Sequence, residues 1–229
     1  MQAARTRPPR FAELETAGEA YARALGRLET IVNQARDYYE QGNYKDDGFA
    51  KGKALHPGLL AAWDEFRLAH RALNDEVVRL NDELEQAELA RLDKAAGQRL
   101  TYLARKMLLE AKQLVRAGSV ADASGLELAE FRPRLEAYEA SVDALKAYAA
   151  AHAEEAKGVS RLELVIDSAS RTLVGAKELM RRKRDNLKYN DSDRVLIGAN
   201  HAELVSGHPA QLMGRYNDLA ERANDLRWR

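Results

Sequence analysis

The chain has 229 residues, of which 45% are hydrophobic and 31% are charged, and its 36 basic side chains balance 36 acidic ones. The length suits one large domain or two small ones. The zero net charge argues against a nucleic-acid-binding protein, which usually carries a basic excess. The absence of cysteine excludes disulfides, thiolate chemistry and cysteine-based zinc sites.

The first predicted element is a helix from about residue 10 to residue 40. Residues 1–10, ahead of it, carry three Arg and two Pro but no apolar segment, so they do not form an intact signal peptide. Apolar or small side chains recur in the helix at alternating steps of three and four residues, as in a packed amphipathic helix. These positions are Phe11, Leu14, Gly18, Tyr21, Leu25, Leu28, Val32, Ala35 and Tyr39.

The segment from Tyr38 to Pro57 is the clearest predicted loop, because it contains three glycines and a proline, and Gly58 follows directly. An ordinary connector between antiparallel helices needs about 2–8 residues. This longer one is either an ordered cap over the end of a helical bundle or a binding surface, and the two interpretations are compatible. Its candidate binding residues are Tyr38, Tyr39, Tyr44, Asp46, Asp47, Phe49, Lys51, Lys53 and His56.

The periodic pattern restarts after Pro57, which suits the first position of a helix. It favours one long helix from about residue 58 to residue 117, bent at Gly97, with a separate turn near 93–98 as the alternative. Trp63 and Phe66 lie three residues apart and share a helix face. We expect these two aromatic side chains to form one buried cluster with Tyr38 and Tyr39.

Further helices are predicted beyond a break at residues 118–125. One begins near Pro133 after a looser turn, a second runs from about 159 to 186, and a last one begins at Pro209, with a polar loop at 186–193. No segment of several residues shows the alternation of apolar and polar side chains that is typical of a strand. The predicted fold is therefore all-α, an elongated antiparallel bundle of long amphipathic helices with one long ordered loop. It forms a single domain over 1–229, with two lobes about residue 97 as a variant.

No sequence motif indicates catalysis, a cofactor or a metal site. The basic run Arg181–Arg184 reads as a solvated helix end, where cations are favoured by the helix dipole, or as an anion-binding patch. His70 and His152 fall on apolar stripes and read as core or boundary residues. No apolar run approaches the roughly 20 residues that a membrane span needs.

The loop residues from Tyr38 to Pro57, the helix after them, and Gly207-His208-Pro209 resemble the YiiG-like family of bacterial envelope lipoproteins, a domain family of unknown function. The resemblance implies an all-helical domain that is exported and tethered by a lipidated cysteine. The chain contains neither leader nor cysteine, so a periplasmic or envelope location assumes a trimmed leader, and a cytoplasmic location is the alternative. The family implies no catalytic residue.

The predicted function is a non-enzymatic helical module of the bacterial envelope that binds an unknown protein or small-molecule partner. It has no nucleic-acid partner and no membrane span, although the full-length protein could carry a lipid anchor. The alternative is a small-molecule or cation-binding protein that uses the loop 38–57. A third interpretation is a hydrolase centred on Asp46, Asp47 and His56.

Overall fold

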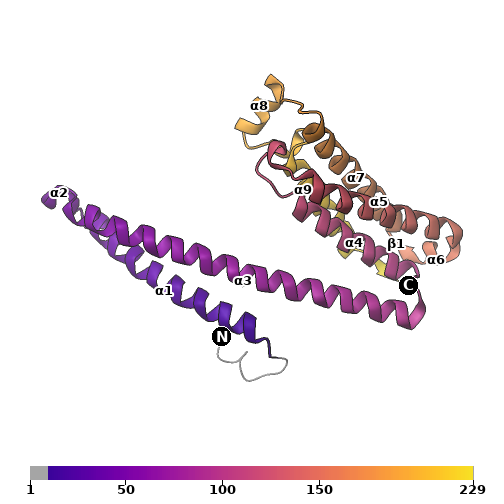
Figure 1. The fold of residues 1–229 in the computed structure, drawn as a ribbon, viewed down its shortest axis with the longest axis horizontal. Helices are drawn as coiled ribbons and strands as arrows, with labels where there is room; N and C mark the ends of the chain where they lie inside the picture. Colours follow the sequence, from indigo (N-terminus) through magenta and orange to yellow (C-terminus); the bar gives the residue numbers. More distant parts are fainter. Residues whose placement is uncertain (1–9, 229) are drawn as a thin grey trace. The chain divides into compact units, whose positions relative to one another are not determined.

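The computed structural model describes residues 10–228 and confirms the all-α fold (Figure 1). The prediction about the N-terminal residues lies almost wholly outside this range. No helix in the described part of the chain is long and apolar enough to cross a lipid bilayer. The elements are α1 (Ala12–Glu40), α2 (Tyr44–Asp47), α3 (Ala50–Ala96), α4 (Leu100–Ala117), η2 (Ala123–Gly125), α5 (Leu128–Ala151), α6 (Ala153–Lys157), β1 (Val159–Ser160), α7 (Leu162–Arg184), α8 (Asp191–Gly198), η3 (Ala202–Leu204), α9 (Pro209–Asn224) and β2 (Arg227–Trp228).

The chain divides into two compact units, Met1–Gln86 and Ala87–Arg229, with the division inside α3. We call them the hairpin unit and the bundle unit. In the hairpin unit, α1 and the first part of α3 run side by side in opposite directions, and α2 lies in the turn between them (Figure 1). Arg27 of α1 pairs with Glu65 of α3, at 2.8 Å, across the two helices.

The predicted long loop is wrong, because α3 begins at Ala50 and continues through Pro57. Of the glycines that suggested a loop, Gly42 and Gly48 have positive φ in the turns around α2, whereas Gly52 and Gly58 lie where α3 packs on α1. A Cβ atom on Gly52 would lie 2.7 Å from the hydroxyl oxygen of Tyr39, and one on Gly58 would lie 3.6 Å from Ile31 of α1. The absence of a side chain at Gly52 lets α1 approach α3 closely.

The predicted single helix from 58 to 117 is also wrong, and the alternative, a turn near 93–98, is correct. Gly97 has a φ of +72°, a left-handed conformation that ends α3 before α4 begins at Leu100. Glycine adopts this conformation at little cost because it has no Cβ atom.

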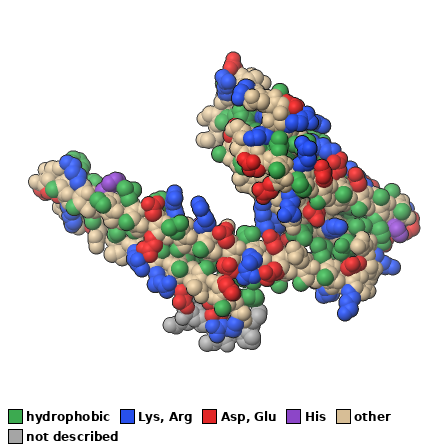
Figure 2. Space-filling model, viewed as in Figure 1, with side chains coloured by type: hydrophobic (Ala, Val, Ile, Leu, Met, Phe, Trp, Pro, Cys, Tyr) green, Lys and Arg blue, Asp and Glu red, His purple; other side chains and the backbone are tan. Residues whose placement is uncertain are grey.

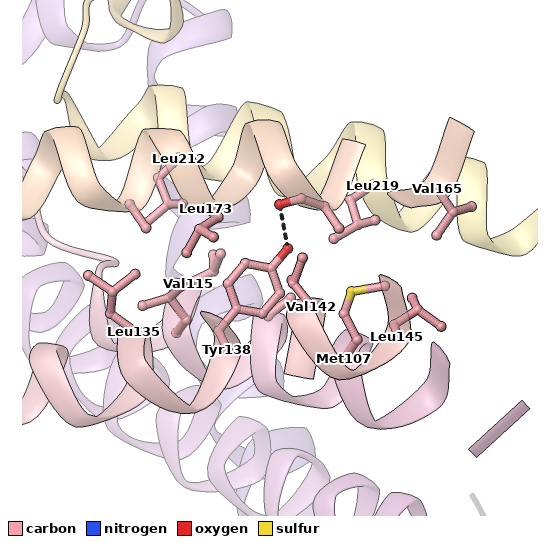
Figure 3. Packing of buried hydrophobic residues seen from close by; sticks show 14 of the residues in the cluster. Met107, Val115, Leu135, Tyr138, Val142, Leu145, Val165, Leu173, Leu212 and Leu219 are labelled. Carbon is pink, nitrogen blue, oxygen red and sulfur yellow. Dashed lines mark hydrogen bonds between the residues drawn. The ribbon is translucent and has the colours of Figure 1, made fainter. Parts of the chain in front are cut away.

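The bundle unit is a four-helix bundle in which α4 packs on α5, α5 on α7, α7 on α9, and α9 on α4. Its helices bury one continuous core, part of which is shown in Figure 3. Tyr138 lies fully buried in this core, and its hydroxyl group donates a hydrogen bond to the carbonyl oxygen of Ala169, at 2.9 Å. The main hydrophobic core of the described chain therefore belongs to the bundle unit.

Several boundaries in the bundle unit differ from the sequence prediction. Helix α5 begins at Leu128 instead of Pro133, so the proline lies inside the helix, one turn after its start. Helix α8 was not predicted; Asn190 and Asp193 form a reciprocal capping box at its start. The pair of two-residue strands, β1 and β2, was missed because two residues cannot show an alternating pattern. The predicted start of α9 at Pro209 is confirmed.

Candidate functional site

The turn of the hairpin unit is held by a hydrogen-bonded pair of predicted site residues. The buried hydroxyl group of Tyr38 donates to one carboxylate oxygen of Asp47, at 2.6 Å. The other oxygen accepts the backbone N–H of Lys51, at 3.0 Å, in the first turn of α3. Asp47 thereby satisfies a donor at the start of the helix, which otherwise has no intrahelical partner.

These contacts shift the acid–base properties of both partners. The hydrogen bonds from Tyr38 and Lys51 lower the pKa of the Asp47 carboxyl group below its usual value. Burial, together with the hydrogen bond to Asp47, raises the pKa of Tyr38 to about 12. Both oxygens of Asp47 are therefore occupied in stabilising the turn, which leaves this carboxylate poorly placed to bind a cation.

Four aromatic side chains form a continuous row, which we call the aromatic turn. Ring centroids are separated by 5.0 Å between Tyr38 and Tyr39, 5.9 Å between Tyr39 and Tyr44, and 5.2 Å between Tyr44 and Phe49. Tyr39 and Phe49 are about half exposed. The aromatic turn therefore presents ring surface to solvent as well as fixing the end of the hairpin.

The remaining predicted residues are less closely joined. The amino group of Lys51 lies 5.9 Å from the centre of the Tyr38 ring, within the range of a cation–π contact. Asp46, Lys53 and His56 are exposed, and no side-chain hydrogen bond or ion pair within residues 10–228 joins them to the aromatic turn. Nowhere in the described part of the chain do three or more His, Asp or Glu side chains form a group that could hold a metal ion.

The expected single aromatic cluster is wrong. Trp63 stacks on Phe66, at 5.8 Å, and Phe66 contacts Tyr21 of α1, at 5.5 Å, in a second cluster separate from the aromatic turn. His70 lies 6.0 Å from the Tyr21 ring and, like Trp63, is exposed, so neither is a core residue. The Trp63 side chain is 48% exposed.

A row of partly exposed apolar side chains runs along one side of the hairpin unit. Leu25, Val32 and Tyr39 follow each other at seven-residue steps on α1, as do Trp63, His70 and Val77 on α3. Side chains seven residues apart lie on the same side of a helix. Tyr21, one turn before Leu25, contacts His70, so the two rows share one side of the hairpin.

We call this surface the hairpin face and define it by Leu25, Val32, Tyr39, Trp63 and Val77. Each of the five side chains is between 41% and 48% exposed. Only Ala24, Tyr38 and Ala62 are buried among the described residues of the hairpin unit. Figure 2 shows hydrophobic side chains at the surface between charged ones along both helices.

The hairpin face was not predicted, although the sequence contained its signal. The seven-residue repeat in residues 11–39 has two apolar rows, which together would form the seam of a two-helix contact. In the structure, the contact with α3 is made by a neighbouring row that includes Ala24, Ile31 and Tyr38, together with Tyr21 of the repeat itself. The row containing Leu25 and Val32 is therefore left over.

The comparison with known families matches residues 1–225 to DUF3829, a family of proteins of unknown function. The chain belongs to this family. It is also 28% identical, over 220 residues, to the uncharacterized protein YiiG of Escherichia coli (strain K12). The alignment covers 96% of this chain but only 60% of YiiG. These matches confirm the resemblance inferred from the sequence, and no solved structure matches the chain.

Proposed function

We propose that the chain is a non-enzymatic interaction module of the bacterial cell envelope and that its hairpin face binds an amphipathic helix of a partner protein. The observation that carries this proposal is the exposed apolar row on a hairpin that has few buried residues. Large apolar patches on a protein surface commonly mark interaction sites. The envelope location rests on the resemblance to envelope lipoproteins.

The spacing of the hairpin face favours a helical partner. Its side chains recur every seven residues on two antiparallel helices, which creates a shallow apolar strip along both. An amphipathic helix presents anchors at matching steps and can pack into such a strip. The aromatic turn extends the strip, because Tyr39 belongs to both surfaces and Tyr44 and Phe49 continue the row of rings.

The alternative, a small-molecule or cation site at residues 38–57, has weaker support. Asp47 is already engaged by Tyr38 and by the start of α3. The rings of Tyr39 and Phe49 favour an apolar contact over coordination of a hard cation, which prefers oxygen ligands. We therefore assign the aromatic turn to the same protein-binding surface as the hairpin face.

Site-specific photocrosslinking in the bacterium tests this proposal. A photoreactive residue at Val32 on the hairpin face is compared with one at Thr30, two residues away on α1. Residues two apart in a helix do not lie on the same side. Thr30 lies instead beside a groove that Arg27 and Gly58 also line. The proposal requires adducts to one partner protein from Val32 but not from Thr30. Equal adducts at both positions, or adducts only to a second copy of this chain, would contradict it.

The location is tested separately with the natural full-length gene product. Externally added protease should cleave it in cells whose outer membrane has been permeabilised, while a cytoplasmic marker stays intact. Protection of both proteins to the same degree would place the protein in the cytoplasm and remove the envelope part of the proposal.

A further inference from the structure

A basic pocket of about 500 Å³ lies in the bundle unit, where the end of α7, the loop after it, η2 and α8 meet. Its charged lining consists of Arg182, Lys183, Lys188 and Arg194 with a single carboxylate, Asp122. The segment 181–194 carries six basic and three acidic residues, although the whole chain has no net charge. Figure 2 shows basic side chains at the surface around α8.

The basic charge of this pocket is only partly neutralised. The Lys183 amino group donates to the carbonyl oxygen of Ser124, and the Lys188 amino group donates to the amide oxygen of Asn186, at 3.1 Å. Both acceptors are uncharged. Arg194 lies 3.7 Å from Asp191, and both side chains are exposed, so that ion pair contributes little. Neither of these hydrogen bonds pairs a lysine with a carboxylate, and each amino group has further N–H donors available.

Arg182 is built into the wall of the pocket and is not the solvated helix-end residue that the sequence suggested. Its side chain is only 13% exposed, and its guanidinium group donates two hydrogen bonds to the carbonyl oxygen of Ser206. The same group lies 4.3 Å from the centre of the Tyr189 ring and 3.8 Å from the Asp193 carboxylate. A Cβ atom on Gly207 would lie 3.0 Å from the Arg182 Nε atom, so glycine leaves room for this arrangement.

We propose that this pocket binds a phosphomonoester with a small apolar or aromatic portion. Two lysines whose hydrogen-bond acceptors are uncharged, Lys183 and Lys188, favour a dianion over a single carboxylate ligand, and Lys and Arg are the usual phosphate-binding side chains. The pocket falls within the 300–1,000 Å³ range typical of small-molecule sites. Tyr189 and Leu187 provide an apolar wall for the rest of the molecule. The phosphate can belong to a soluble metabolite or to a lipid headgroup.

Calorimetry with phenyl phosphate tests the binding, and vesicles with and without phosphatidic acid distinguish a soluble source from a lipid. We expect Lys183→Gln with Lys188→Gln to weaken binding at least about tenfold, or about 1.4 kcal/mol. Arg181→Gln is the matched control, since Arg181 lies on the same helix, α7, and is exposed, but does not line the pocket. If the double variant fails to fold, the test uses Lys188→Gln alone, because Lys188 is exposed and its replacement should not disturb the fold.

Three outcomes would overturn the proposal. The first is no binding of phenyl phosphate and no binding to phosphatidic acid vesicles by the folded wild-type chain. The second is equal weakening by Arg181→Gln, which would indicate general charge attraction. The third is binding to phosphatidylglycerol vesicles as strong as to phosphatidic acid vesicles, because a phosphodiester lacks the dianionic group.

Discussion

At the residue scale, the neighbouring carboxylates Asp46 and Asp47 have different environments although they are indistinguishable in the sequence. Both side chains are exposed, but Asp47 accepts hydrogen bonds from Tyr38 and from the N-terminus of α3, whereas the Asp46 side chain makes no such bond within residues 10–228. Loss of the Asp47 carboxylate leaves the buried Tyr38 hydroxyl group without this acceptor, and an unsatisfied buried polar group is destabilising. We expect Asp47→Ala to lower the melting temperature of the hairpin unit and Asp46→Ala to leave it nearly unchanged. Equal effects in a circular dichroism melt would refute the distinction.

His208 provides a second prediction at this scale, because its ring nitrogen caps α9. The Nδ1 atom accepts a hydrogen bond from the backbone N–H of Ala210, at 3.0 Å, which requires that nitrogen to be unprotonated. Burial lowers the pKa of His208, nearby Arg182 acts in the same direction, and Asp122 opposes them. The Tyr189 ring lies 5.7 Å away.

The sign of the pH dependence follows from this shift. A lowered pKa in the folded state means that the unfolded state binds the proton more readily. The stabilisation is present above the unfolded value of about 6.5 and is lost as the pH falls through it. Asn keeps a side-chain acceptor at the N-cap but does not titrate. Between neutral pH and pH 5 or so, the wild type should therefore lose more stability than His208→Asn in urea titrations, and parallel losses would disprove the assignment.

At the element scale, Gly97 separates α3 from α4 through its backbone conformation alone. Apart from its two chain neighbours, no heavy atom in the described part of the chain lies within 4 Å of the position that a Cβ atom would take at Gly97, so an added methyl group would meet no clash. The left-handed conformation nevertheless costs a non-glycine residue about 1–2 kcal/mol. We expect Gly97→Ala to reduce the free energy of unfolding by about that amount. Gly26→Ala is the control, since Gly26 also has open space but lies inside α1 with an ordinary helical φ, and it should be neutral or stabilising.

Two aromatic residues on different elements should respond very differently to truncation. Phe131 of α5 is fully buried in the core of the bundle unit, whereas Trp63 of α3 is about half exposed. We expect Phe131→Ala to cost about 3–5 kcal/mol, as is typical of a buried aromatic side chain. Trp63→Ala should cost much less. Similar losses in chemical denaturation would mean that Trp63 is buried in solution and that the hairpin face is covered.

The sequence predicted those helices that have an apolar repeat over many residues or a proline that marks the first turn. Four heptads were enough for α1, and Pro209 after His208 located α9. The start of α3 was missed because Gly52 serves close helix contact, a tertiary role that composition cannot separate from a loop. Helix α8 has eight residues, too few for a clear helical period.

The candidate site was only partly predictable for a related reason. The sequence placed aromatic and charged residues near the turn, but it could not separate Asp46 from Asp47, whose difference lies in hydrogen bonds with Tyr38 and Lys51. The sequence also could not show which apolar row of α1 is exposed, because this depends on which row packs against α3. The basic pocket joins η2 to residues 182–194, a long-range contact that local sequence does not reveal.

At the scale of the whole molecule, stability and recognition are assigned to different units. The continuous core is in the bundle unit, while the hairpin unit has few buried residues and a row of half-exposed apolar side chains. A surface that exists for binding can be changed without loss of the fold. A surface that is part of a core cannot, because a buried charge is strongly destabilising.

The most direct test is the dissociation constant of the purified partner identified by the Val32 crosslink, measured for Val32→Glu and Thr30→Glu with the melting temperature of each variant. We predict that Val32→Glu weakens binding at least about tenfold, equivalent to about 1.4 kcal/mol, with little change in melting temperature. Thr30→Glu should leave binding unchanged. Equal weakening by both variants, or loss of binding only in step with loss of stability, would contradict the assignment of the hairpin face as the interaction surface.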